Sequence, residues 1–274
     1  MDSAQLSPAF PSALQQFEIG AWAEGPAVFG GASSRPRAEM DDTLPTGLDG
    51  PADDLSERLD PRLHWIPSLR AVGARTDAIE LFERLRGAYS ERHRHHQTLQ
   101  YLAECLARLV RWREAAEHPH EVALAIWFKD AVYDPLRHDN EGRSARLAFD
   151  SLTAAGVDTE VARRVRDLVV ATRHDSPPAT NDGKLVVDID LSYLAAGSER
   201  HAQAERNLRR EMGHVTDFIY RRRRIEALKA LAARLRIYQS DLVRASLETR
   251  ARANIAATIA RLQSRVLNPE TLFQ

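Results

Sequence analysis

Residues 124–133 read Leu-Ala-Ile-Trp-Phe-Lys-Asp-Ala-Val-Tyr, and this stretch decides the fold. The longer segment from His120 to Tyr133 is apolar on several sides rather than along one stripe. A helix of that kind is buried among other elements. Lys129 and Asp130 therefore stand out, because they place two ionisable groups at the end of a helix that the pattern predicts to be central.

Helical periodicity continues on both sides of this stretch, and no alternating strand pattern of useful length occurs. The predicted helical segments are residues 77–87, 98–117, 120–133, 140–155, 159–172, 185–194, 199–236 and 240–267. Asp158 is expected to cap the helix that follows it, and Asp188 a helix near residue 185. The sequence thus predicts an all-α bundle of about seven to nine helices, forming one domain over residues 61–267.

The two ends of the chain differ in composition from this domain. Residues 1–60 are rich in Pro, Gly, Ala and Ser without sustained periodicity, which is typical of a disordered tail. One patch, residues 17–29, is apolar enough to dock on the body of the protein or on a partner, and it is equally consistent with a chance cluster. Residues 268–274 are interpreted as a tail or as the remnant of a cleaved tag.

The charges of the chain balance overall but not along its length. Lys and Arg total 38 against 39 Asp and Glu, which indicates no particular partner. Acidic residues predominate in residues 1–60 and arginines in residues 206–265, which is consistent with a tail folded back onto the C-terminal helices or with two solvated surfaces. Nucleic acid is not expected as a partner, because the arginine run 221–224 lacks interleaved aromatic residues.

Other features exclude several classes of protein. No apolar run approaches the roughly 20 residues of a membrane span, and the N-terminus lacks the basic-then-apolar order of a secretory signal. We therefore expect a cytoplasmic protein with no membrane partner. The single cysteine, Cys105, excludes an internal disulfide and is expected to be a small buried hydrophobe. The long amphipathic C-terminal helices are compatible with a homo-oligomer.

A series of short blocks occurs in a fixed order between about residues 80 and 240. The blocks are Tyr89-Ser90-Glu91, Trp127-Phe128, Asp130 to Tyr133, Asn140-Glu141, Ser144-Ala145, Thr172, Asp188, Asp190-Leu191-Ser192, Leu194, Arg209, Glu211, Arg222 and Ile237-Tyr238. In this order they resemble a subgroup of predicted metal-dependent phosphohydrolases of the HD superfamily. Members of that subgroup have Trp-Phe-His-Asp-Ala-Val-Tyr where this chain has Trp-Phe-Lys-Asp-Ala-Val-Tyr. The resemblance implies an HD-type helical bundle.

The resemblance also implies a divalent cation held by two histidines and two carboxylates, which ionises a bound water beside phosphorus. The ligand histidines of the family fall on Tyr101 and Lys129, and its carboxylates on Asp130 and Asp190. A lysine cannot replace a ligand histidine, because its ammonium has only donors, and a neutral phenol ligates weakly. No cofactor is therefore expected. If Mn, Mg, Fe or Zn is retained, we expect it at Asp130, Asp190 and His174.

Lys129 suggests how the carboxylates can persist without the metal. Its ammonium would supply positive charge among Asp130, Asp190 and Glu141, forming a buried ion cluster. In the alternative interpretation Lys129 extends outward into solvent and the site is merely eroded.

Further polar residues are candidates for binding a phosphate group. Asn140, Glu141 and Ser144 lie near a predicted helix start, where backbone N–H groups favour anions. Arg209 and Arg222 could bind an anion through their two-pronged donors. Capping by Asn140 and an intrahelical ion pair of Arg209 with Glu211 or Glu205 are the structural alternatives.

The sequence supports two hypotheses about function. In the first, the chain is a catalytically impaired pseudo-phosphohydrolase that binds a small phosphate-containing ligand or a protein partner. In the second, it is an active metal-dependent phosphohydrolase on a nucleotide or another phosphate ester, with an altered site built on Asp130, Asp190 and His174. The neighbouring His93, His95 and His96 are expected to be solvated rather than to act as substitute ligands.

Overall fold

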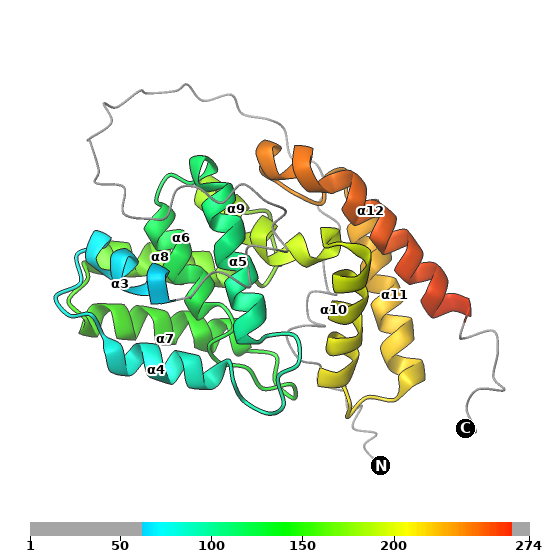
Figure 1. Cartoon of the computed structure of the whole chain (residues 1–274), viewed down its shortest axis with the longest axis horizontal. Coiled ribbons are helices and arrows are strands. Elements are labelled where there is room, and N and C mark those ends of the chain that lie inside the picture. Colours follow the sequence, from blue (N-terminus) through cyan, green and yellow to red (C-terminus); the bar gives the residue numbers. More distant parts are fainter. Residues whose placement is uncertain (1–61, 265–274) are drawn as a thin grey trace, which may run out of the picture.

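The computed structural model describes residues 62–264, which form ten α-helices, two 3₁₀ helices and no strand (Figure 1). The all-α prediction is therefore confirmed for these residues. Predictions about the tail (1–60), its apolar patch (17–29) and residues 268–274 lie outside the described residues. The elements are α3 (Arg62–Ala71), α4 (Ile79–Ala88), α5 (Leu99–Arg111), η1 (Arg113–Ala115), α6 (Pro119–Phe128), α7 (Asn140–Ala154), α8 (Thr159–Ala171), α9 (Asn181–Asp190), η2 (Leu191–Ala195), α10 (Ser198–Glu211), α11 (Asp217–Ala233) and α12 (Asp241–Ser264).

The ten described α-helices exceed the predicted seven to nine for two reasons. Helix α3 precedes the first predicted segment and contains Pro67, which argues against a helix in a sequence pattern. The predicted segment 199–236 is two helices, because the chain turns after Glu211 and restarts at Asp217. The Thr216 side chain caps the new helix by accepting from the backbone N–H of Ile219.

Helix α6 lies at the centre of the part of the molecule formed by α3–α9. It packs against α3, α5, α7, α8 and α9, and every residue from Glu121 to Phe128 is buried. The ring of Trp127 meets those of Trp65 and Phe82 at centroid distances of 5.4 Å. Burying one large apolar side chain stabilises the fold by about 1.5–3 kcal/mol. The prediction of a central buried helix is confirmed.

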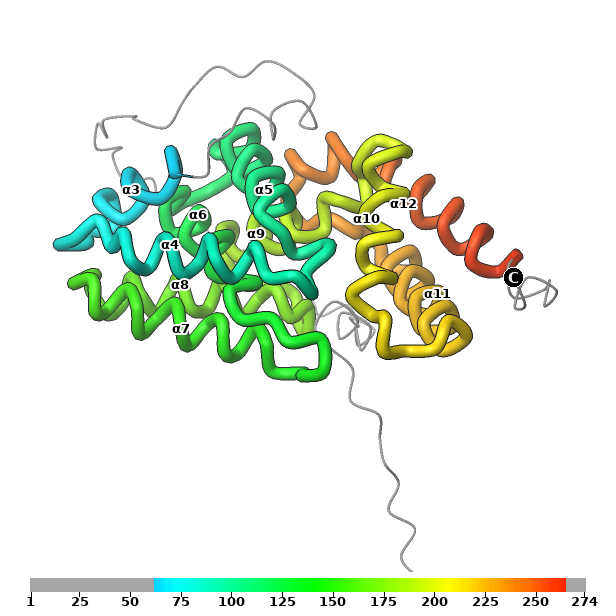
Figure 2. Tube along the Cα trace, turned by 60° about the horizontal axis from the view of Figure 1, so that its bottom comes forward, coloured from blue at the N-terminus to red at the C-terminus, as the bar shows by residue number. Residues whose placement is uncertain are grey.

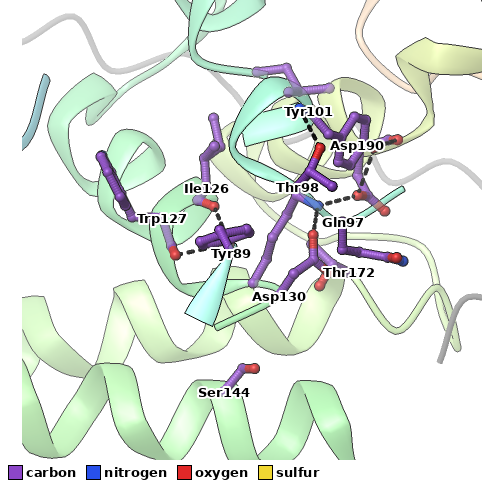
Figure 3. A network of polar contacts seen from close by, with 12 residues as sticks. Tyr89, Gln97, Thr98, Tyr101, Ile126, Trp127, Asp130, Ser144, Thr172 and Asp190 are labelled. Atoms are coloured by element: carbon purple, nitrogen blue, oxygen red, sulfur yellow. Dashed lines mark hydrogen bonds and ion pairs between the residues drawn. The ribbon is translucent and has the colours of Figure 1, made fainter. Parts of the chain in front are cut away.

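The C-terminal end of α6 is held by side chains from the segment that follows α4. The Tyr89 hydroxyl donates to the carbonyl of Trp127 at 3.0 Å (Figure 3). The Arg94 guanidinium donates to the carbonyls of Asp130 at 2.6 Å and Ala131 at 3.2 Å. These donors satisfy carbonyl groups that the end of a helix leaves without an intrahelical partner. They also fix the backbone that carries Lys129 and Asp130.

Helices α10–α12 form the end of the molecule opposite α3, as Figures 1 and 2 both show. A buried ion pair joins Arg224 of α11 to Glu205 of α10, with Arg224 Nε 3.1 Å from Glu205 Oε2. The same guanidinium donates to the Tyr193 hydroxyl of η2 at 3.3 Å. This contact ties the C-terminal helices to the segment directly after Asp190.

Asp188 does not cap a helix near residue 185, contrary to the prediction. Helix α9 begins earlier, where the Thr180 side chain accepts from the backbone N–H of Gly183 at 3.0 Å. The Asp188 carboxylate instead accepts from the backbone N–H groups of Gln239 at 2.8 Å and Ser240 at 2.7 Å. Asp188 therefore anchors the start of α12 to α9.

Asp158 caps α8 as the sequence predicts, because its Oδ1 accepts from the backbone N–H of Glu160 at 2.8 Å. Asp158→Ala is expected to lower the free energy of unfolding by about 1 kcal/mol, the usual worth of an N-cap side chain. Asp158→Ser, which keeps an acceptor at the same place, is the matched control. Urea denaturation of the three proteins measures the effect. Equal losses in the two variants would contradict a capping role.

Candidate functional site

Lys129 lies at the centre of a cluster of polar side chains where α6 and α9 end. Its Nζ forms ion pairs with Asp130 Oδ2 and, at 2.8 Å, with Asp190 Oδ1. The same atom lies 4.6 Å from the centroid of the Tyr101 ring. The Lys129 side chain is 2% exposed, so it does not extend into solvent. Figure 3 shows the carboxylates of Asp130 and Asp190 converging from the two helix ends.

Asp190 is the most heavily bonded member of this cluster. The Tyr101 hydroxyl donates to the Asp190 carbonyl oxygen at 2.5 Å and lies 3.3 Å from Oδ1. His174 Nε2 lies 2.8 Å from Asp190 Oδ2. His174 has a φ of 59°, in the left-handed region that residues other than glycine rarely adopt. The backbone strain at His174 thus accompanies a specific contact with the carboxylate.

The opposite charges in this cluster stabilise one another in their ionised forms. Burial alone would lower the pKa of Lys129, but the Asp130 and Asp190 carboxylates raise it well above its ordinary value. Burial would raise the pKa of Asp190, but the Lys129 ammonium and the His174 hydrogen bond hold it well below its ordinary value. At neutral pH the cluster therefore contains an ammonium between two carboxylates.

The residues predicted as metal ligands do not fit a metal ion as the structure arranges them. The Lys129 ammonium lies between the carboxylates of Asp130 and Asp190, and a second cation there would be repelled. His174 Nε2, the donor that the resemblance offered to a metal, contacts Asp190 instead. Within residues 62–264, no group of three or more His, Cys, Asp or Glu side chains is placed to hold a metal ion.

The cavity beside Lys129 is very small. Its volume is about 20 Å³, which is room for about one water molecule. Pockets that bind small molecules typically enclose about 300–1,000 Å³. The cavity as shaped therefore excludes a phosphate ester. Its lining residues are His96, Gln97, Tyr101, Lys129, Asp130, Asp190, Tyr193 and Leu208.

His96 is the lining residue that the sequence interpretation placed wrongly, since it was expected to be solvated. It is buried, and its ring centroid lies 4.5 Å from that of Tyr101 and 5.0 Å from that of Tyr193. Its Nδ1 has no hydrogen-bond partner among residues 62–264, and burial lowers its pKa to about 3. The helical angle gave no guide to its position, because α5 begins only at Leu99.

Glu211 is a second contributor, for which the sequence suggests only an ion pair with Arg209; Arg209 instead pairs with Asp217 at 3.3 Å. One of its carboxylate oxygens accepts from the backbone N–H groups of His95 at 2.7 Å, His96 at 2.6 Å and Gln97 at 3.2 Å. The other accepts from the Tyr133 hydroxyl at 3.0 Å. Glu211 therefore fixes the segment that places two residues of the cavity wall. For this role its only sequence signal is membership of the ordered blocks.

Asn140 and Ser144 do not line the cavity and instead hold the loop between α6 and α7. Asn140 Oδ1 accepts from the backbone N–H of Asp134 at 3.1 Å, and its Nδ2 donates to the Asp134 carbonyl at 2.9 Å. Ser144 Oγ accepts from the backbone N–H of Val132 at 3.0 Å. The polar atoms predicted to bind a phosphate group are thus used within the fold.

Arg209 and Arg222 also lie outside the cavity wall. Arg209 donates to the carbonyls of Met212 at 2.7 Å and Val215 at 3.0 Å, which stabilises the turn between α10 and α11. Arg222 is exposed on α11 and pairs with Glu226 at 3.1 Å. The structure does not bring the predicted phosphate-binding side chains together.

Glu141 lies at the start of α7, buried but in no ion pair within residues 62–264. Burial and, more weakly, the carboxylates of Asp130 and Asp190 raise its pKa to about 7 from 4.5. The pKa of Glu141 therefore depends on the charges of Asp130 and Asp190, although Glu141 forms no ion pair with Lys129.

Glu141→Gln is expected to change how stability depends on pH. Because the pKa of Glu141 is raised on folding, the folded state binds the extra proton between pH 4.5 and about 7. Its contribution therefore falls as pH rises through this window. The variant should match the parent near pH 4.5 and exceed it by about 3 kcal/mol above pH 7. Parallel stability curves from urea denaturation across this range would contradict the expectation.

None of the helices in the described part of the chain combines the length and apolar content that crossing a bilayer requires. Comparison with known proteins finds no matching family model, no similar curated protein and no similar solved structure.

Proposed function

We propose that the chain is a catalytically inactive relative of the HD-type phosphohydrolases, in which the Lys129 ammonium occupies the place of the metal ion. One observation carries this proposal: Lys129 Nζ pairs with both Asp130 and Asp190, the carboxylates that the resemblance assigns to the metal. The ammonium satisfies these buried charges, which would otherwise strongly destabilise the fold.

The chemistry of the cluster supports binding rather than catalysis. Metal-assisted hydrolysis needs a dication that lowers the pKa of a bound water and an open position for the substrate. An ammonium has only hydrogen-bond donors and no coordination position to offer. The cavity of about 20 Å³ also leaves no room for a phosphate ester beside Lys129.

The kind of molecule bound follows from the same geometry. Asn140, Ser144, Arg209 and Arg222 are engaged elsewhere in the fold or lie outside the cavity wall. A small phosphate ligand therefore has no assembled set of donors at this place. We accordingly propose a protein partner in the cytoplasm, recognised on the surface of the helical domain.

The proposal is tested by elemental analysis of protein purified without chelator, together with hydrolysis of p-nitrophenyl phosphate in added Mn²⁺. We expect no stoichiometric transition metal and no turnover above that of the buffer. Near-stoichiometric Mn, Fe, Zn or Ni together with turnover would overturn the proposal and favour an active phosphohydrolase.

A further inference from the structure

A groove lies between α4 and α7, away from the cavity beside Lys129. Its volume is about 640 Å³, within the range of about 300–1,000 Å³ that is typical of pockets that bind small molecules. Leu81 of α4 and Leu147 and Ala154 of α7 supply apolar surface in its lining. Figures 1 and 2 show α4 and α7 side by side, at the end of the molecule opposite α11. The groove is therefore large enough for an apolar side chain and is separate from the Lys129 cluster.

The loop before α4 holds this groove in place. The backbone N–H of Arg75 donates to the carbonyl of Ala155 at 2.8 Å, which joins the loop to the end of α7. Gly156 follows with a φ of 85°, and a Cβ added there would lie 2.8 Å from the Arg75 side chain. Ala154 and Ala155 line the groove and are too small to fill it. The groove is thus formed by the fold itself.

The lining of the groove carries charge that the described part of the chain does not compensate. Glu80 and Asp150 contribute carboxylates and Arg84 a guanidinium, and none of the three forms an ion pair within residues 62–264. With two negative groups against one positive group, the lining has a net charge of about −1 at neutral pH. A partner that presents an apolar side chain beside a basic one would complement it.

The start of α11 exposes such a combination of side chains. Phe218 is 66% exposed and Ile219 is 40% exposed, and Phe218 is the only aromatic side chain among the exposed large hydrophobic residues of the described chain. Arg222 lies one turn further along α11, on the same side as Phe218. Its ion pair with Glu226 joins two exposed side chains, so exchanging it for another partner costs little. We call Phe218, Ile219 and Arg222 the α11 patch.

We propose that copies of this chain associate through the α11 patch of one copy and the groove between α4 and α7 of another. Phe218 and Ile219 cover the apolar lining, and Arg222 lies beside Asp150. The patch and the groove are different surfaces of the chain, so the contact is heterologous, as when an exposed apolar side chain enters a pocket of another subunit. The inference does not depend on whether Lys129 replaces a metal ion.

Sedimentation velocity of the full chain from about 10 µM to about 1 mM tests the association, because weak contacts between copies form in this range. We expect the average mass to rise with concentration. Phe218→Ser removes the inserted ring and Ala154→Trp fills the groove, so each should weaken the association at least about tenfold. Leu235→Ser and Thr153→Trp are the matched controls and should associate as the parent does. Leu235 is exposed beyond the end of α11, and Thr153 is exposed on α7 without lining the groove.

Mixing the two weakened variants makes the test specific. Phe218→Ser keeps the groove and Ala154→Trp keeps the patch, so an equimolar mixture should form a pair of one copy each, at concentrations where either variant alone is monomeric. The pair cannot grow, because its remaining patch lacks the ring and its remaining groove is filled. A mixture that stays monomeric would overturn the proposal, since it would exclude a contact between patch and groove.

Exchange of charge tests the placement of Arg222. Arg222→Glu should weaken the association about tenfold, and adding Asp150→Arg to the same chain should restore it, because opposite charges meet again. A synthetic peptide of residues 214–226 needs no variant of the chain and should lower the average mass by competing for the groove. Circular dichroism checks that every variant is folded. A parent chain that is monomeric over the whole range, equal association of the parent and Phe218→Ser, or no restoration by Asp150→Arg contradicts the proposal.

Discussion

Lys129→Met is expected to lower the free energy of unfolding by about 3–5 kcal/mol at pH 7, the usual effect of removing one partner of a buried ion pair. Methionine fills nearly the same volume, so the loss comes from charge rather than from a cavity. The variant leaves the carboxylates of Asp130 and Asp190 beside each other without the ammonium that now contacts both. Urea denaturation at pH 7 measures the loss.

The pH dependence of this loss identifies its cause. In the parent chain the pKa of Asp190 is held below its ordinary value. The stability it contributes is therefore present above the unfolded pKa and is lost as pH falls through the folded pKa. Without Lys129 a carboxylate must take up a proton to relieve repulsion, so the deficit of Lys129→Met should shrink as pH falls below about 5.

A second variant serves as the matched control for this prediction. Lys129→Met/Asp130→Asn/Asp190→Asn removes the whole cluster, and replacing a complete buried ion pair by neutral groups is often close to neutral in stability. We expect this triple variant to recover most of the loss. A deficit in Lys129→Met below about 1 kcal/mol, independent of pH, would show that the cluster is not held by charge.

The central helix and its charged end were predictable because the residues that indicate them are consecutive in the sequence. Eight successive buried residues in α6, Glu121 to Phe128, leave no polar face in the sequence pattern. Lys129 and Asp130, at the end of this otherwise apolar block, then identify the place where charge must be compensated. The N-cap of α8 at Asp158 is similarly local, since donor and acceptor are two residues apart.

The remaining features of the site were not predictable because they depend on contacts between distant segments. Glu211 binds the backbone N–H of His95 across 116 residues of sequence. Asp188 binds that of Ser240 across 52. A single sequence gives no signal for such pairs, so it suggests only local roles: a helix cap for Asp188 and an ion pair with Arg209 for Glu211. The size of the cavity depends on how many side chains converge on Lys129, which no single helix determines.

The predicted phosphate-binding residues Asn140 and Ser144 do not line the cavity, because their side chains bind the loop between α6 and α7. Asn140 and Ser144 are polar residues at a helix start, a pattern that suits an anion site and a loop anchor equally well. The structure uses them as loop anchors, through the backbone N–H groups of Asp134 and Val132.

We expect that a metal site can be created by placing histidine at positions 101 and 129. Tyr101→His/Lys129→His would place two imidazoles beside the carboxylates of Asp130 and Asp190, a donor set suited to Zn²⁺ or Mn²⁺. Tyr101 and Lys129 already adjoin, with Nζ 4.6 Å from the ring centroid. Removing the ammonium also removes the charge that repels a cation.

The affinity for Zn²⁺ of the parent chain and the double histidine variant, measured side by side by isothermal titration calorimetry, tests the central claim most directly. We expect weak or no binding by the parent and a dissociation constant at least about a hundredfold lower for the variant. Tyr101→Phe/Lys129→Met, which removes the same groups without adding ligands, should show no such gain. A double histidine variant that binds no better than this control would contradict the account. So would a parent chain that already binds the ion tightly beside Asp130.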